Sequence, residues 1–497
     1  MSMHEPARTG ERGVAMITVM MIVVVLTLLM VSALNYAVQS EPLSRRDQDW
    51  NAALAAAQAG VDDYLYRLQQ EDDYYLFSAT NPPTPANPAL TGWQTIPGPA
   101  NQGQFHYSVD LAQYASQGIV QLNSTGRVRG VQRTIRANLR RRNFLDYLYL
   151  TDYESLDPQS GYYSDPATAS AACDVYWWQG RPTSPCVRIS FVTGDILNGP
   201  LHTNDTISVN GSPRFNEKVT TGNPDVLSCP ASATYTYRWY GRSGCGDTPQ
   251  FQTGDPENVP LLTLPSSNTA IKAETNRAAG KTGCLYNGPT RIVLLSTGRM
   301  NVTSPFTTSS SYANCVGNNI AMPTNGVIYV QNVPSTQSAT CTGTQNRLGY
   351  PIVGDVTPYQ CRVGDVFLSG TLRGRLTVAA ENNIVVVSNT TYSSSGPSSN
   401  DMLGLIANQF VQLYHPVTIG GQNLPDNRNP TSLFQNPRLD AAILALGHSF
   451  IVQNYDEGSP LGTLSITGGI AQKWRGPVGT FGGGGTGYLK NYNYDSR

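Results

Sequence analysis

Residues 13–40 read GVAMITVMMIVVVLTLLMVSALNYAVQS and contain no charged side chain. A helix of about 20 apolar residues is enough to cross the hydrocarbon core of a bilayer, so this stretch is long enough to span it. A short polar leader, MSMHEPARTGER, comes before it, and the rest of the chain is far more polar. We therefore expect one membrane-spanning helix over residues 14–40 that carries a large body on one side of the membrane.

The helical pattern continues past the apolar stretch. Apolar residues recur every three or four positions, with charged residues between them, which indicates an amphipathic helix. These apolar positions are Trp50, Leu54, Ala57, Val61, Leu65 and Leu68. A cleaved secretory signal fits less well, because its apolar core usually runs only about 7–15 residues. We expect one helix over residues 14–72, apolar all round in its first half and amphipathic in its second.

The composition indicates a chain of two or three units rich in strands and turns. A length of 497 residues is too great for one ordinary core. Only 13% of the residues are charged, whereas Gly (47), Pro (33) and Tyr (27) are abundant, as is typical of strands and turns. The net charge of −1 gives no sign of a protein that binds nucleic acid through its overall charge.

The cysteines favour disulfides in an oxidising compartment. Eight are present, no two form a C-x-x-C pair, and the tight spacing of zinc ligands is missing. They are Cys173, Cys186, Cys229, Cys245, Cys284, Cys315, Cys341 and Cys361. Eight cysteines allow many connectivities, of which the pairing of neighbours (173–186, 229–245, 284–315 and 341–361) would close short surface loops. We expect no metal site.

Glu11-Arg12-Gly13 followed by VAMITVMMIVVVLTLLM resembles the N-terminus of type IV pilins and pilin-like proteins. Within that family it is most similar to PilX-type minor pilins and to the tip pseudopilins of type II secretion, over residues 8–70. The resemblance implies a leader over residues 1–13 and a prepilin peptidase that cuts between Gly13 and Val14. It also implies two further partners, namely other pilins or minor pilins contacted through the helix and an inner-membrane assembly platform.

Thr18 departs from the pattern of the major pilins. It stands at the fifth mature position, where major pilins carry a glutamate that is thought to neutralise the terminal amine of a neighbouring subunit. A subunit without that glutamate suits a filament tip, where nothing stacks above it, or a subunit that is seldom incorporated.

After the helix, residues 73–104 are rich in Pro, Asn and Thr and predict a loop. Alternating apolar and polar residues over 105–150 predict antiparallel strands packed on the helix. Arginines crowd these strands, at Arg127, Arg129, Arg133, Arg136, Arg140, Arg141 and Arg142. We interpret them as a solvated sheet face rather than a site for nucleic acid or anionic lipid, and we expect no nucleic-acid partner.

Residues 151–497 predict a disulfide-bearing, solenoid-like ectodomain with inserted loops. Short apolar runs are separated by Gly, Asn and Asp, as the coils of a parallel β-helix require. A Gly-Asp-(Ile/Val) step occurs at Gly194-Asp195-Ile196 and again at Gly364-Asp365-Val366. The period is irregular, so a β-sandwich is the alternative. The fold class expected for the whole chain is α+β.

No catalytic motif stands out, and we expect neither an enzyme nor a cofactor. Asp195 and Asp365 are the best candidates for acids of the kind that β-helical polysaccharide enzymes use, but Asp is also common in turns. His202 beside Asp205 is best interpreted as a polar turn residue. An aromatic group could form a binding platform, but packing is the commoner role of such residues. Its members are Tyr162, Tyr163, Tyr176, Trp177 and Trp178.

The sequence therefore predicts a pilin-like minor subunit or assembly protein of a bacterial type IV pilus. We expect a single-pass protein of the cell membrane whose ectodomain lies outside the cytoplasm, on the pilus or cell surface after assembly. At the filament tip the ectodomain would serve cell adhesion by contacting an extracellular surface ligand. The alternatives are a pseudopilin-type component of a secretion machine and a membrane-anchored β-helical enzyme acting on polysaccharide.

Overall fold

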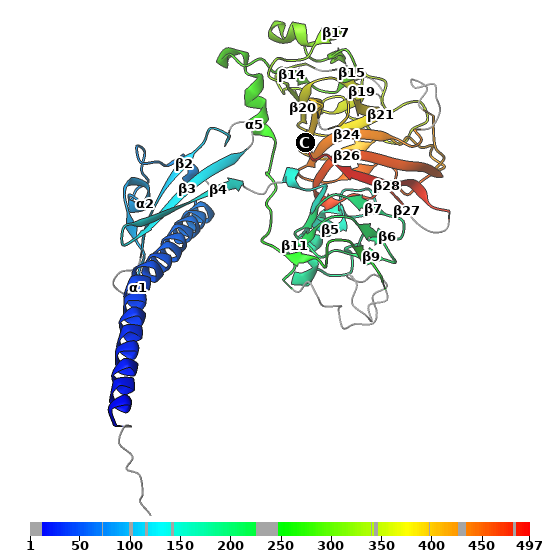
Figure 1. The fold of residues 1–497 in the computed structure, drawn as a ribbon. Helices are drawn as coiled ribbons and strands as arrows, with labels where there is room; N and C mark the ends of the chain where they lie inside the picture. Colours follow the sequence, from blue (N-terminus) through cyan, green and yellow to red (C-terminus); the bar gives the residue numbers. More distant parts are fainter. Residues whose placement is uncertain are drawn as a thin grey trace, which may run out of the picture. The chain divides into compact units, whose positions relative to one another are not determined.

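The computed structural model divides the chain into two compact units, Met1–Arg142 and Asn143–Arg497 (Figure 1). The residues that it describes are 12–71, 73–98, 103–114, 118–140, 144–224, 247–338, 340–341, 346–396, 398–425, 434–480 and 484–497. The sequence placed the boundary near residue 150, whereas residues 149–156 form a strand of the larger unit. Alternation alone cannot tell which of two sheets a strand joins.

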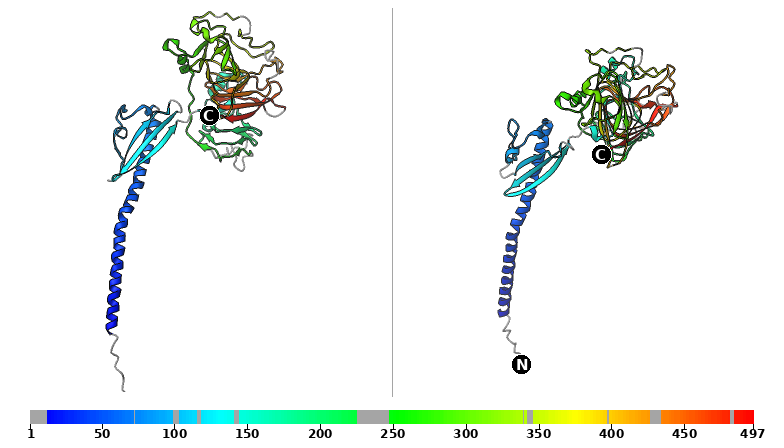
Figure 2. Two further views of the ribbon diagram at one scale, coloured as in Figure 1. Left: turned by 45° about the horizontal axis from the view of Figure 1, so that its top comes forward. Right: turned by 90° about the horizontal axis from the view of Figure 1, so that it is seen from above.

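The helix α1, Arg12–Gln70, is 59 residues long. Its first half extends beyond the sheet of its own unit and is exposed over 15–36 (Figure 2). In its second half small side chains face the sheet: Ala53, Ala56 and Ala57 are buried. Alanine combines the highest helix propensity with the smallest side chain, so it both favours the helix and allows close packing.

The smaller unit has one antiparallel sheet in the order β1-β2-β3-β4. Its strands are β1 Gln94–Thr95, β2 Gln104–Asp110, β3 Ile119–Val128 and β4 Val131–Arg140. Arg129 and Gly130 form the β3–β4 turn, and both have positive φ (45° and 88°), as a two-residue hairpin requires. Short helices flank the sheet at η1 Tyr74–Leu76 and α2 Pro88–Thr91.

Glycine lets α1 lie directly on β3. A Cβ at Gly126 would collide with the carbonyl oxygen of Ala53 and the amide nitrogen of Ala57. Next to this contact the Ser124 hydroxyl donates a hydrogen bond to the carbonyl of Ala57 at 2.8 Å. The helix and the sheet therefore meet backbone to backbone.

The larger unit is rich in strands, and most of them pair in parallel. The first ladder runs through β14 Cys284–Asn287, β18 Val327–Gln331, β20 Arg375–Ala380, β22 Met402–Ala407, β24 Arg438–Ala445, β26 Pro460–Arg475, β5 Tyr149–Leu156, β8 Leu201–Thr203, β11 Val219–Thr221 and β13 Glu257–Asn258. The second runs through β15 Thr290–Leu295, β19 Val366–Leu372, β21 Ile384–Tyr392, β23 Val411–Leu413 and β25 Phe450–Val452. The third includes β12 Gln250–Phe251, β10 Arg214–Phe215, β7 Ile196–Asn198, β28 Thr486–Tyr494 and β26.

The remaining elements are short and lie between the ladder strands. The strands are β6 Phe191–Val192, β9 Val209–Asn210, β16 Arg299–Thr303, β17 Gly317–Ala321 and β27 Gly479–Thr480. The helices are η2 Phe144–Asp146, α4 Pro166–Cys173, η3 Trp177–Gln179, α5 Thr269–Lys272, η4 Ala273–Thr275, η5 Arg277–Ala279 and η6 Ser310–Cys315.

Apolar side chains stand in columns because the ladders are in register. Successive strands of the second ladder place Leu368, Val386, Leu413 and Val452 opposite one another, and all four are buried. A glycine completes this packing: Gly370 has φ of 106°, and a Cβ there would meet the carbonyl of Leu294 on the neighbouring strand. Parallel strands stacked in this way share one continuous core.

The order of strands along the first ladder is not the order in the sequence. The early strand β5 pairs with the late strand β26, and β28 pairs with both β26 and β7. On one side of the β5–β26 pair, the first ladder continues from β5 through β8 and β11 to β13. On the other side, it runs from β14 through β18, β20, β22 and β24 to β26. The strands late in the sequence therefore fill the middle of the ladder.

A connecting segment, residues 259–283, joins the two ends of the first ladder. Near its start the backbone N–H of Leu262 donates to Asn204, which follows β8, at 2.8 Å. Farther along, the Asn268 side chain donates to the carbonyls of Ala380 and Ile406 at 2.7 and 3.0 Å, and it accepts from the Tyr329 hydroxyl at 3.0 Å. The segment follows the ladder strand by strand.

Within the described residues three disulfides are formed, each between one cysteine and the next cysteine along the chain. They are Cys173–Cys186, Cys284–Cys315 and Cys341–Cys361, with Cα–Cα distances of 5.5, 5.9 and 5.9 Å. These are three of the four neighbouring pairs favoured by the sequence. Cys229 and Cys245 lie outside the described residues.

Candidate functional site

The exposed half of α1 is the largest apolar surface that the sequence singled out. Ala15–Tyr36 has a mean hydropathy of 2.8 and is long and apolar enough to cross a membrane. Its large side chains are about half to three-quarters exposed, from 49% at Leu26 to 78% at Tyr36. Apolar surface of this extent is unfavourable in water, so it requires lipid or other apolar helices around it.

Two threonines within this stretch have hydroxyl groups that bond to the helix itself. Thr18 donates to the carbonyl of Ala15 at 3.0 Å, and Thr27 donates to the carbonyls of Val23 and Val24 at 2.9 and 2.8 Å. A hydroxyl bonded to its own helix places no uncompensated charge among lipid tails. The predicted processing residues Gly13 and Val14 lie in the first turn of α1.

The second half of α1 is fixed to the sheet by charged and aromatic contacts. The Nε of Arg129 donates to Asp49 at 2.8 Å, and the Arg133 guanidinium lies 3.3 Å from the centre of the Trp50 ring. Asp63 accepts from the hydroxyl of buried Tyr107 at 2.8 Å, and burial together with this bond raises the Tyr107 pKa. These contacts make the helix and its sheet one support for the exposed half.

The arginines of β3 and β4 are engaged with partners in their own unit. Arg127 stacks on Trp93 at 4.0 Å, and Arg136 donates to Asn123 at 3.2 Å. Arg129 and Arg133 contact the helix, as described above. Arg141 and Arg142 lie outside the described residues. These arginines are therefore positioned by contacts within their own unit.

The two candidate acids do not come together in one site. Asp195 accepts from the Nζ of Lys490 at 2.9 Å and from the amide of Val192 at 3.0 Å. Asp365 lines a different pocket, where it accepts from the side chain of Asn382 at 2.6 Å and burial raises its pKa to about 6. Because glycoside hydrolysis uses two carboxylates facing one substrate, these positions give no such pair.

His202 is fully buried and has partners on both ring nitrogens. Its Nδ1 lies 2.9 Å from the Thr220 hydroxyl, and its Nε2 lies 2.9 Å from Oδ1 of Asn204. It therefore stabilises the ladder between β8 and β11. Within the described residues no group of three His, Cys, Asp or Glu side chains is placed to hold a metal ion.

The aromatic group singled out in the sequence is held in place partly by hydrogen bonds to the backbone. Trp177 and Trp178 donate from their indole nitrogens to the carbonyls of Glu154 and Asn204 at 2.7 and 3.1 Å. Tyr176 stacks on Trp178 at 5.5 Å. Tyr162 and Tyr163 contact each other at 5.2 Å, and Tyr163 packs on the main core. Tyr163, Tyr176, Trp177 and Trp178 are partly buried, whereas Tyr162 is 58% exposed.

Sequence reasoning missed two buried ion pairs close to this aromatic group. Arg181 lies 2.8 Å from Asp205, and Arg475 lies 2.5 Å from Glu154, with all four side chains almost completely buried. Burial raises the pKa of Asp205 to about 7. No local motif marks these residues, because each pair joins positions far apart in the chain.

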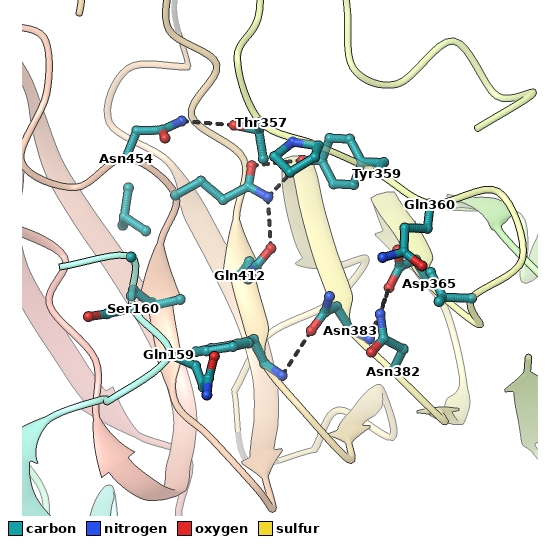
Figure 3. Close-up of a pocket in the computed structure, with 17 residues that line it drawn as sticks. Gln159, Ser160, Thr357, Tyr359, Gln360, Asp365, Asn382, Asn383, Gln412 and Asn454 are labelled. Atoms are coloured by element: carbon teal, nitrogen blue, oxygen red, sulfur yellow. Dashed lines mark hydrogen bonds between the residues drawn. The ribbon is translucent and has the colours of Figure 1, made fainter. Parts of the chain in front are cut away.

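A polar pocket of about 470 Å³ opens on the outer side of the second ladder (Figure 3). It draws residues from loops near 159–161, 357–360, 382–383 and 453–454, and from β23. Apart from Asp365, none of its residues had been picked out from the sequence. Amide side chains scattered over some 300 positions carry no local signal.

The comparisons with known proteins bear on the helix alone. Residues 12–62 match the family described as PilX N-terminal. The match covers most of α1 and supports a PilX-type protein of the type IV pilus. No curated protein and no solved structure matches the chain.

Proposed function

We propose that this chain, with its PilX-type N-terminal segment over residues 12–62, is a minor subunit or assembly protein of a bacterial type IV pilus. One observation carries the proposal: an exposed apolar segment of 22 residues continues, within the same helix α1, into a half that is packed on its own sheet. In this arrangement the membrane anchor and the folded smaller unit are connected by one continuous helix. The larger unit is then displayed outside the cytoplasm, as disulfides favour.

The proposed mechanism is the exchange of one apolar environment for another. In the membrane the exposed half of α1 is surrounded by lipid, and in a filament it packs against the helices of other pilins or minor pilins. This exchange costs little free energy, because lipid tails and apolar side chains are similar surroundings. An inner-membrane assembly platform would drive the transfer.

The proposed maturation step is cleavage between Gly13 and Val14 by a prepilin peptidase. Val14 then begins the mature chain, and Thr18 occupies its fifth position. Because Thr18 is neutral and bonded to Ala15, it offers no carboxylate to the terminal amine of a neighbour. We therefore place this subunit at the filament tip or in the initiation of assembly, where the ectodomain would meet a surface ligand.

We also propose that the larger unit is an irregular parallel β-helix. Its three parallel ladders with stacked apolar columns support this fold over a β-sandwich, whose strands pair mainly antiparallel. The two Gly-Asp steps fit this interpretation, because each is followed directly by a strand: Ile196 begins β7 and Val366 begins β19. In both cases the aspartate precedes a ladder strand.

N-terminal sequencing of the membrane-bound protein tests the proposal. We expect the mature chain to start at Val14 in cells with the prepilin peptidase and to keep its leader in cells without it. Gly13→Leu should block cleavage while leaving the helix in the membrane, and Gly10→Leu in the same leader is the matched control. An uncleaved chain in wild-type cells would contradict the proposal and leave a plain membrane anchor.

Deletion of the gene distinguishes a role in the pilus from a role in a secretion pseudopilus. Loss of surface pili with normal protein secretion supports the pilus role. Loss of secretion with normal pili would instead assign the subunit to a secretion pseudopilus.

A further inference from the structure

The polar pocket on the second ladder involves no residue of α1. It lies wholly within the larger unit and has a volume of about 470 Å³, which is within the range of small-molecule sites. Loop 357–360 borders it and is held in part by the disulfide Cys341–Cys361. The walls of the pocket therefore consist of ladder strands and a loop that is attached to a disulfide.

Amide side chains dominate the lining of this pocket. Figure 3 shows Asn382 and Asn383 near Asp365, with Gln412 between them and the Thr357 and Asn454 pair. Among the residues that the structure describes, no Lys, Arg or His lines the pocket, and Asp365 is its single carboxyl group. A site of this kind has no cation to hold a phosphate, sulfate or carboxylate ligand.

The amides are held in fixed positions. Gln453 is 6% exposed, exchanges hydrogen bonds with the Tyr359 hydroxyl at 2.9 and 2.7 Å, and donates to Oε1 of Gln412 at 2.7 Å. Asn454 is similarly held, donating to the Thr357 hydroxyl at 3.0 Å and to the carbonyl of His415 at 2.7 Å.

Fixed amides leave their other ends available to a ligand. Within the described residues, Gln412 uses Oε1 as an acceptor, and the structure records no partner for its Nε2. Asn382 uses its Nδ2 to bond Asp365, and the structure records none for its Oδ1. The pocket thus presents both donors and acceptors, with apolar walls at Phe410 and Ile451.

We propose that this pocket binds a neutral saccharide. Sugar hydroxyls both donate and accept, so they pair well with planar amides and a carboxylate, while the C–H face of a sugar ring packs on apolar walls. Preorganised amides reduce the entropy lost on binding. The inference goes beyond the pilus role and does not rest on it, because the pocket involves no residue of α1.

Binding of the full-length protein to an oligosaccharide array tests the inference. The protein should be kept in lauryldimethylamine oxide, because detergents with sugar head groups would compete for the site. The probes are neutral glucans, mannans, galactosides and N-acetylglucosamine oligomers, printed beside sialylated and sulfated glycans. We expect retention of at least one neutral oligosaccharide, followed by calorimetry to measure its affinity.

Gln412→Met should weaken that affinity about tenfold, the effect expected for the loss of one or two hydrogen bonds. Gln360→Ala, at an exposed position on the pocket rim, keeps the test valid if the first variant folds poorly. Gln252→Met, at an exposed glutamine that does not line this pocket, is the matched control and should bind like the wild type. Retention of charged glycans only, of no glycan, or of a neutral glycan with unchanged affinity in both pocket variants would overturn the inference.

Discussion

Arg475 and Glu154 form a buried ion pair across 321 residues of sequence, with Nη1 of the arginine 2.5 Å from Oε2 of the glutamate. Glu154 belongs to β5 and Arg475 ends β26, so the pair lies where an early strand meets a late one. The Arg475 guanidinium also stacks on Phe191 at 3.8 Å. This ion pair thus reinforces the pairing of β5 with β26, which joins the two halves of the first ladder.

Arg475→Met should destabilise the larger unit by about 3 kcal/mol, because it leaves the Glu154 carboxylate buried without its partner. The double variant Arg475→Met/Glu154→Gln should recover a large part of this loss. Urea unfolding followed by tryptophan fluorescence measures both. Lys281→Met, which breaks an exposed pair with Glu274, is the control and should change stability by less than about 1 kcal/mol. Equal effects of Arg475→Met and Lys281→Met would contradict the prediction.

Asp365→Asn should stabilise the larger unit at neutral pH. Burial raises the pKa of this carboxyl from 3.8 to about 6, so the folded state favours the protonated form. The group therefore adds most stability below about pH 4, loses it as the pH rises to about 6, and adds none above. The variant should gain up to about 3 kcal/mol at pH 7.5, and the gain should shrink towards pH 4. Unfolding midpoints at pH 7.5 and 4.5 measure this, and a gain independent of pH would refute the burial argument.

Gly126→Ala should weaken the contact between α1 and its sheet. The added methyl group would meet backbone atoms of Ala53 and Ala57, which cannot move as a side chain can. We expect a loss of about 1–3 kcal/mol and faster hydrogen exchange in β3. Gly92→Ala has room for the methyl group, with its nearest contact at 3.8 Å, and should exchange like the wild type. Unchanged exchange in both variants would show that the helix and sheet separate easily.

Val24→Arg should reduce membrane insertion. Val24 lies near the middle of the apolar stretch, where an arginine costs about 2.5–3.5 kcal/mol on insertion scales. Carbonate extraction of membranes measures the retained fraction, which should fall. Leu54→Arg, on the part of α1 beyond that stretch, should leave retention unchanged. Equal retention of both variants would argue against a spanning role for residues 15–36.

The sequence predicted the local features of this molecule well and its long-range pairings poorly. The apolar run of α1 followed from composition, and the presence of strand-rich structure followed from short apolar runs between turns. The buried face of the second half of α1 was predicted only in part, because Trp50, Leu54 and Leu65 are exposed while Ala53 and Ala56 are buried. The pairing of β5 with β26 did not follow from the sequence, because the residue pattern of a strand is the same whichever strand it pairs with. For the same reason residues 149–150 were assigned to the wrong sheet.

The pocket was beyond prediction on similar grounds. Asp365 was noted as a candidate acid, but Gln412 and Asn454 are ordinary polar residues in the sequence. Only the stacking of β21, β23 and β25 brings them near one another. The buried pair Arg181–Asp205 was likewise hidden, since aspartate in a turn is common and nothing marked its partner.

The late arrival of β26 and β28, which pair with strands from early in the chain, constrains how the larger unit folds. Synthesis delivers β5 and β7 early, yet their partners β26 and β28 follow only after more than 250 further residues. Such a high contact order slows folding and leaves strand edges open in the meantime. The early segments would therefore depend on chaperones until the late strands are available.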